Sequence, residues 1–415
     1  MANDRTQVDA DHDVTAAASK PRRTRAARVA RALPTLLALL VLAAISGSCG
    51  KGFFSSANTS PTPTPTTTPT AGALTYVTNF NDAEISEFNR NSVTGALTTP
   101  KMAKSGSVKG PIQLTVSPSQ QGLYVANQAD NKIHQFGIGN SGKLSPIGSG
   151  AIAAGTSPQQ VAVTPAGAFA YAVNLGGVGS ISEYTINAAN GALGSNGTVN
   201  NGVTHPISVV ATDTFVYVAD LQSGNGVVLS YAINADGTLA TPPSSVPSLG
   251  VVTASTPGPM VMDAANGNFV FVSDTVQGIV SVFSTSGGPL SFVSRTLPTN
   301  SAQAGIVYVA VGGNTFLYST NQSPLVNSVS VSSFNTVLGV LTLLGASPFG
   351  SGLNMPTGLA SDPSGQFLYV TNQGNGTVTQ FTIDSTTGAL SAPASVNTEN
   401  PANANSAPLF IAITH

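Results

Sequence analysis

Short runs of alternating apolar and polar residues follow one another from residue 73 to the C-terminus. The clearest group begins at Pro356 and reads PTGLASDPSGQFLYVTNQGNGTVTQFTIDSTTGAL. Its segments GLASD, QFLYVTN and TVTQFTID are alternating or rich in β-branched and aromatic residues, which is typical of strands. Pro/Gly turns such as DPSG separate them, and Asn372 is expected to cap its own turn. With TTGAL leading into one more segment, the pattern predicts four short strands.

This four-strand unit recurs along the chain. An aromatic residue in the second strand marks each of seven units, and the mean period is about 49 residues. Four-stranded propeller blades repeat every ~40–50 residues. The aromatic anchors are Tyr76, Tyr124, Tyr171, Tyr217, Phe271, Tyr318 and Tyr369. Units with a first strand begin at Pro111, Pro158, Pro206, Pro259, Gly305 and Pro356.

The two ends of the repeat region complement each other. The first unit begins directly at its second strand, LTYVTN, and the last eight residues, PLFIAITH, correspond to a first strand alone. A ring that takes its last strand from the C-terminus leaves no unpaired blade edge at the seam. We therefore predict an all-β fold, a seven-bladed β-propeller over residues 73–415, with four-stranded blades and the C-terminal strand completing blade one.

The N-terminal region has a different character. Basic residues precede an apolar run at residues 33–47, which predicts an export signal over residues 1–49. Cys49, in ISGSCG, resembles the cysteine of a bacterial lipobox and is the predicted lipid attachment site. A Thr/Pro-rich tract over residues 50–72 predicts an extended linker. These features indicate an exported protein anchored by lipid to the outer membrane or cell surface, or alternatively secreted.

Composition narrows the range of partners. Net charge is −2, and from residue 73 onward the chain is mildly acidic, so it has no basic surface for nucleic acid. Because Cys49 is the only cysteine, no disulfide can form within the chain. His205 and His415 belong to opposite ends of innermost strands, which argues against a histidine metal site. We expect no cofactor, no metal and a monomer.

The units resemble those of the YVTN-repeat, lactonase-type propeller family, which includes 6-phosphogluconolactonase. In its enzymes the innermost strands begin with a sequence like GPRH, which places Arg and His at one mouth of the central channel, and a Glu often follows the Asn that ends strand two. None of these charges is present here. The residues at the Arg/His positions are Ile112 and Gln113, Gln159 and Gln160, Ile207 and Ser208, Met260 and Val261, Thr357 and Gly358, and Leu409 and Phe410. Those after the turn Asn or Asp are Phe80, Gln128, Leu175, Leu221, Thr275 and Gln373.

Three polar residues remain as candidates for ligand binding at the channel mouth: Gln113, Gln160 and His205. Their amides can hydrogen-bond a sugar or a peptide, but they supply neither nucleophile nor acid. Alternatively, they satisfy backbone groups at a sealed channel end. Arg90 and Arg295 are the only arginines of the repeat region and fit solvated surface charges.

These observations favour a cell-envelope propeller that acts as a ligand- or protein-binding module, with a glycan, lactone or protein as ligand and no catalytic residue identified. Two alternatives stay open. One is a lactonase of the 6-phosphogluconolactonase type, a carboxylic ester hydrolase, and the other is a structural or adhesive surface protein.

Overall fold

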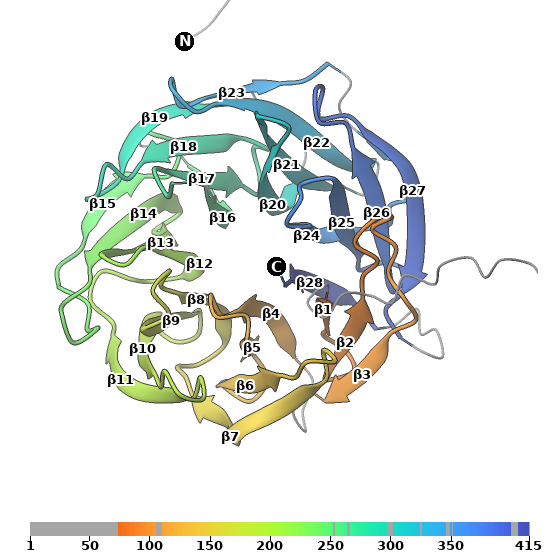
Figure 1. The fold of residues 1–415 in the computed structure, drawn as a ribbon. Helices are drawn as coiled ribbons and strands as arrows, with labels where there is room; N and C mark the ends of the chain where they lie inside the picture. Colours follow the sequence, from red (N-terminus) through yellow and green to blue (C-terminus); the bar gives the residue numbers. More distant parts are fainter. Residues whose placement is uncertain are drawn as a thin grey trace, which may run out of the picture. The chain divides into compact units, whose positions relative to one another are not determined.

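The fold comes from a computed structural model that describes residues 74–104, 110–251, 254–263, 266–296, 302–323, 326–345, 349–350, 352–399 and 406–414. The predicted signal segment, Cys49 and the linker lie outside these residues, so their boundaries stay predictions. The described residues form 28 strands in seven antiparallel sheets of four (Figure 1). No helix occurs among them, and accordingly none that could cross a membrane. The predicted seven-bladed β-propeller is confirmed.

Each blade consists of an innermost strand, two middle strands and an outer strand. The innermost strands are β28 (Pro408–Ile413), β4 (Pro111–Val116), β8 (Pro158–Val163), β12 (Pro206–Ala211), β16 (Pro257–Met262), β20 (Ala302–Val311) and β24 (Pro356–Ser361). The second strands are β1 (Leu74–Asn79), β5 (Gly122–Asn127), β9 (Phe169–Asn174), β13 (Phe215–Gln222), β17 (Phe269–Asp274), β21 (Asn314–Ser323) and β25 (Phe367–Asn372).

The other two strands of each blade face outward from this pair. The third strands are β2 (Glu84–Asn89), β6 (Lys132–Ile138), β10 (Ser180–Ile186), β14 (Asn225–Ala232), β18 (Val280–Ser284), β22 (Val326–Asn335) and β26 (Thr377–Ile383). The outer strands are β3 (Lys101–Lys104), β7 (Leu144–Ala153), β11 (Leu193–Val199), β15 (Ser244–Pro247), β19 (Ser291–Arg295), β23 (Val340–Leu343) and β27 (Leu390–Asn397).

The ring closes through the C-terminal strand, as predicted. β28 pairs antiparallel with β1, with Thr75 opposite Ile413 and Val77 opposite Ile411 (Figure 1). β28 also contacts the innermost strands of both neighbouring blades, β24 and β4. Strands from the two ends of the repeat region therefore share one sheet, and no blade edge is left open at the seam.

The aromatic anchor of each second strand connects its blade to the next one. In six blades it is a fully buried tyrosine whose hydroxyl donates to a glycine carbonyl in the turn before the next blade's outer strand. Tyr124, for example, donates to Gly191 at 2.6 Å, and Tyr369 donates across the seam to Gly95 at 2.6 Å. The repeated aromatic position is thus explained by packing between blades and not by chemistry at the channel.

Blade five is the exception, because its anchor is Phe271 and has no hydroxyl. Its ring packs instead against Phe334 and Tyr308 of blade six, with centroids 4.8 Å and 5.8 Å away. Aromatic pairs in such geometries contribute beyond the area they bury. The interface between blades five and six therefore replaces a hydrogen bond with a cluster of rings.

Two details of the predicted units are corrected by the strand pairing. Blade five begins at Pro257, not Pro259, because Pro257 pairs with Asp274 as Pro356 pairs with Asn372. The predicted capping role is wrong for Asn372, although the equivalent Asn127 and Asp274 do accept from the N–H two residues on, at 3.2 Å and 2.9 Å. The Asn372 amide donates across the sheet to the hydroxyls of Thr377 and Thr379, at 3.0 Å and 2.8 Å.

Candidate functional site

A cavity of about 260 Å³ lies at the mouth of the central channel, where the innermost strands begin. All seven blades contribute to its wall, and the apolar side includes Ile112, Ile207 and Phe410. Among the described residues the wall contains no Asp, Glu, His, Lys or Arg. Its polar side chains are neutral: Gln159, Gln160, Ser208, Thr275 and Gln303.

The structure places only one of the three predicted binding residues in this wall, namely Gln160. Gln113 is not part of the wall and is buried, with 6% of its surface exposed. His205 is exposed and lies just before β12, where its backbone N–H donates to Asp220 Oδ1 at 2.7 Å. The three residues do not form a common site in the described structure, and whether any of them binds a ligand stays a prediction.

In blades two to four, the side chain two positions after the leading proline bonds to the next blade. Gln113 Oε1 accepts from the Val161 N–H at 3.1 Å, and Gln160 Oε1 accepts from the Val209 N–H at 3.1 Å. Ser208 Oγ accepts from the Met260 N–H at 3.0 Å. We call this part of the mouth the glutamine arc. Its polar residues satisfy backbone groups, which is the second of the two roles considered for them.

In blades six, seven and one, a threonine of the second strand makes the bond between blades. Thr320, Thr371 and Thr78 donate to backbone carbonyl oxygens of the next innermost strand, at 2.9 Å, 3.1 Å and 3.0 Å. We call this part of the mouth the threonine arc. The acceptors are the carbonyl oxygens of Thr357, Leu409 and Ile112.

Glycines make this arrangement fit in the threonine arc. A Cβ atom on Gly305 would lie 2.2 Å from the Thr357 carbonyl oxygen, and one on Gly358 would lie 2.6 Å from the Leu409 carbonyl oxygen. Real Cβ contacts are never that close, so no other residue fits without a backbone shift. Two of the positions where the family's enzymes carry charged side chains therefore have no room for a side chain here.

Gln303 is a wall residue that the sequence pattern did not reveal. It pairs with Asn321, as the leading proline of every other blade pairs with the closing Asn or Asp of its second strand. The start of blade six was placed at Gly305 for two reasons. No proline marks the true start, and the hairpin of β20 and β21 is longer than the corresponding hairpins of the other blades. Counting back from Asn321 by the 16 residues that separate Pro111 from Asn127 and Pro356 from Asn372 also gives Gly305, so the spacing in the sequence could not have found Gln303.

The charged side chains of the described residues lie away from the cavity. The interpretation of Arg90 as a solvated surface charge is wrong, because Arg90 is buried at the seam and forms an ion pair, with 3.5 Å between its Nη1 and Asp362 Oδ2. Arg295 donates to the Leu249 carbonyl oxygen at 3.1 Å. His134 contacts Asp130 at 2.7 Å on the third strand, as its sequence position indicated. None of these charges is in the cavity wall, where it could polarise a lactone.

The shifted pKa values also have structural causes. Burial raises the pKa of Glu87, whose Oε1 accepts from the Leu144 N–H of the next blade at 2.9 Å. Burial raises the pKa of Glu183 in the same way, and it accepts from the Leu239 N–H at 2.8 Å. Catalytic acids and bases often show such shifts inside a cleft. Here both carboxylates join blades and neither belongs to the cavity wall.

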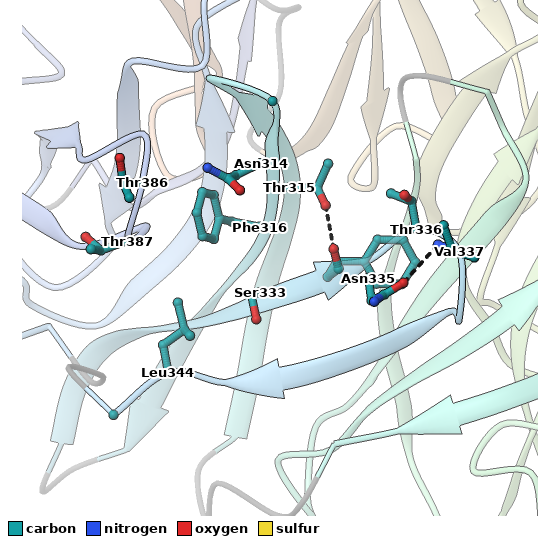
Figure 2. A pocket seen from close by; sticks show the side chains of 13 residues that line it. Asn314, Thr315, Phe316, Ser333, Asn335, Thr336, Val337, Leu344, Thr386 and Thr387 are labelled. Atoms are coloured by element: carbon teal, nitrogen blue, oxygen red, sulfur yellow. Dashed lines mark hydrogen bonds between the residues drawn. The ribbon is translucent and has the colours of Figure 1, made fainter.

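A second hollow, of about 630 Å³, lies between blade six and the turn of blade seven that carries Thr386 and Thr387 (Figure 2). Asn314, Thr315, Phe316 and Val337 belong to its wall, which is also uncharged among the described residues. Asn335 already caps its own turn, accepting from the Val337 N–H at 3.0 Å. No innermost strand reaches this hollow, so it is separate from the channel mouth.

Comparison with known proteins places this architecture in a family. A family model described as Lactonase, 7-bladed beta-propeller matches residues 74–404. The chain belongs to this family. A curated relative, 6-phosphogluconolactonase of Formosa agariphila, is 24% identical over 312 residues, which cover 74% of this chain and 76% of the relative.

Solved structures of the lactonase family share the fold. The periplasmic gluconolactonase of Pseudomonas aeruginosa superposes with a TM-score of 0.68 at 18% identity, covering 83% of this chain and 99% of its own. A putative 6-phosphogluconolactonase of Bacteroides fragilis gives 0.67 at 19% identity, covering 84% and 99%. At these identities the likeness extends to the fold alone.

Proposed function

We propose that this lactonase-family propeller is a binding module, which holds a small uncharged ligand at the channel mouth and does not hydrolyse it. The observation that supports this proposal is the neutral wall of the cavity. Attack on a lactone carbonyl needs a base to activate water and a donor or cation to stabilise the oxyanion. The described wall residues supply only amides and hydroxyls as polar side-chain groups, and two of these, on Gln160 and Ser208, already bond to the backbone.

Charge also argues against a phosphorylated ligand. A phosphate group that enters a partly closed cavity loses water, and this costs several kcal/mol unless a cation or several donors replace it. Arg90 is bonded to Asp362 and Arg295 to a backbone carbonyl, so neither is available at the mouth. A neutral ring compound meets no such penalty.

Parallel measurements of turnover and binding test the proposal. The purified chain is mixed with glucono-δ-lactone in a pH-stat, which records acid release, while calorimetry records binding of the same compound. We expect saturable binding and a hydrolysis rate equal to that of the buffer alone. A rate that rises in proportion to the protein concentration would overturn the proposal, and a family gluconolactonase serves as the positive control.

Hydrolysis of a sugar lactone is the second candidate function. The names of the curated relative and of two structural neighbours favour it. It would require a base and an oxyanion donor that are not among the described wall residues. The pH-stat measurement separates the two functions directly.

We further propose that the protein is exported and attached to the cell envelope through lipid on Cys49. The lipobox-like ISGSCG sequence supports this, and so does the periplasmic neighbour of the same fold. Cys49→Ala is expected to move the chain from the membrane fraction to the soluble fraction. Unchanged fractionation would contradict lipid attachment. The monomeric state stays a proposal, and a glycan or protein ligand stays an alternative to the small ligand proposed at the channel mouth.

A further inference from the structure

Gln303 breaks the repeat at the wall of the cavity. Six blades carry a proline at the position that pairs with the closing Asn or Asp of the second strand, and blade six carries Gln303. A proline there offers no side-chain hydrogen-bonding group, whereas a glutamine brings one acceptor and two donor hydrogens. A repeat protein that departs from its own pattern at a cavity wall has a local reason to do so.

The side-chain oxygen of Gln303 has no partner. Only 1% of the residue is exposed, and its Nε2 makes one long contact, 3.4 Å from Ser319 Oγ. Gln303 Oε1 is buried and accepts no hydrogen bond from any described residue. A buried acceptor that stays unsatisfied costs about 1–3 kcal/mol. Other buried side-chain atoms, among them Thr75 Oγ1 and Asn321 Oδ1, also lack a partner. Gln303 differs from them because it belongs to the cavity wall, where a ligand can supply the missing partner.

Gln113 shows that the unpaired oxygen is not a general property of glutamine in this ring. Gln113 is also buried on an innermost strand, and its Oε1 accepts from the Val161 N–H at 3.1 Å while its Nε2 donates to the Leu114 carbonyl oxygen at 2.8 Å. Both ends of its amide are satisfied. The two glutamines therefore form a matched pair, one structural and one with an unsatisfied acceptor.

Size and charge restrict what the partner can be. The cavity of about 260 Å³ is slightly smaller than pockets for drug-sized ligands, which span ~300–1,000 Å³. Among the described residues, its wall has no charged group to accompany an anion or a cation. Gln303 belongs to the wall, but its Oε1 is shielded in the described structure, so the side chain has to turn toward the cavity to meet a ligand. Once turned, this acceptor calls for an N–H or O–H donor. The size of the cavity restricts the ligand to a single neutral ring or a molecule of that size.

We propose that Gln303 Oε1 is the recognition group of this cavity, and that it selects uncharged ligands that present an N–H or O–H donor. This inference rests on the proposed binding function and narrows its ligand class. Carboxylates and phosphates are excluded, including the open-chain acid that hydrolysis of a lactone would produce.

A matched pair of small probes tests this selection. δ-Valerolactam has one N–H, and N-methyl-δ-valerolactam lacks it, so calorimetry compares ligands that differ in the donor. We expect the full-length chain to bind the lactam about tenfold more tightly, which is the effect of satisfying one buried acceptor. In Gln303→Leu the preference for the lactam over its N-methyl derivative should fall below about twofold, because no side-chain acceptor remains to bond the lactam N–H. 5-Hydroxyvalerate, an anion, should not bind.

Gln113→Leu provides the control, since the same change is made on an innermost strand outside the cavity wall. It should keep the tenfold preference for the lactam. A preference that persists in Gln303→Leu would mean that the methyl group is rejected by size, and this would overturn the inference.

Equal binding of both lactams to the unaltered chain would also overturn the inference, and it would leave the proposed binding function standing. Absence of binding by any probe, with ordered water as the only partner of Gln303, would overturn both. The comparison in the unaltered chain does not depend on whether a variant folds.

Discussion

The glutamine arc and the threonine arc of the channel mouth bond their blades together in opposite ways. In the glutamine arc the side chain comes from the innermost strand, and the adjoining second-strand residues are apolar: Ala126, Val173 and Ala219. In the threonine arc the hydroxyl comes from the second strand, and the innermost strand has Gly305, Gly358 or Phe410 instead. In either arc, one polar side chain at each interface between blades forms a hydrogen bond with the backbone of the next blade.

The difference explains why the mouth is neutral. A position in the glutamine arc cannot take a catalytic Arg or His without leaving a buried N–H of the next blade unpaired. A position such as Gly305 in the threonine arc cannot take any side chain, since its Cβ would meet the Thr357 carbonyl oxygen at 2.2 Å. At the second position after the leading proline, hydrogen bonding and backbone spacing thus oppose the family's charged side chain.

Removing β28 should destabilise the propeller more than any single substitution in either arc. This strand carries the Leu409 carbonyl oxygen that accepts a hydrogen bond from Thr371 in the threonine arc. Deletion of residues 408–415 also strips β1 of its inner partner. We expect loss of a cooperative transition in thermal denaturation followed by circular dichroism. A truncated chain that melts like the full-length chain would contradict closure through β28.

Gly305→Gln converts a threonine-arc position to the residue type of the glutamine arc. The new Cβ would lie against the next blade's backbone, so we expect a loss of about 3 kcal/mol or more in the free energy of unfolding. Urea denaturation measures it. Gly288→Gln is the control, because a Cβ there meets nothing within 4 Å and should cost far less. Equal losses would show that the two arcs are interchangeable.

Gln113→Leu and Gln303→Leu should separate a satisfied amide from an unsatisfied one. The first leaves the Val161 N–H buried without its partner, which should cost about 1–3 kcal/mol in the free energy of unfolding. The second removes an acceptor that has no partner, so stability should stay within about 0.5 kcal/mol or rise. Similar losses in both variants would mean that Gln303 has a structural role.

Thr371→Val tests the hydroxyl of the threonine arc alone. Thr371 Oγ1 donates to the Leu409 carbonyl oxygen and accepts from the Gly358 N–H at 2.7 Å, and losing both should cost about 1–2 kcal/mol. Thr75→Val is the matched control, since Thr75 Oγ1 is buried and has no partner. It should be neutral or stabilising in the same urea titration. An equal loss in the free energy of unfolding for Thr75→Val and Thr371→Val would contradict a stabilising role of the Thr371 hydroxyl bonds.

The smallest expected effect is that of pH on ligand binding. No titratable group belongs to the described cavity wall, so the affinity for δ-valerolactam should vary less than about twofold between pH 5 and pH 9. Calorimetry at several pH values measures it. A bell-shaped dependence would reveal an acid or base acting at the mouth and would favour the lactonase function.

The sequence predicted the fold well because its information is local and repeated. Strand alternation, turn residues and the aromatic anchor recur seven times, and the C-terminal segment PLFIAITH matches the strand that blade one lacks. The channel mouth was harder to predict. The sequence shows a glutamine at positions 113, 160 and 303 alike, whereas only the packing of neighbouring blades shows which amide oxygens accept a backbone N–H. Gln303 was missed because blade six has lost the proline that marks its start.

A crystal structure of the chain with δ-valerolactam shows whether Gln303 binds the donor of a ligand. We expect one lactam molecule in the channel-mouth cavity, with its nitrogen about 2.7–3.2 Å from Gln303 Oε1. Gln113 should keep its bond to the Val161 N–H. A cavity that holds only water at saturating lactam, or a lactam whose N–H points away from Gln303, would contradict this role of Gln303.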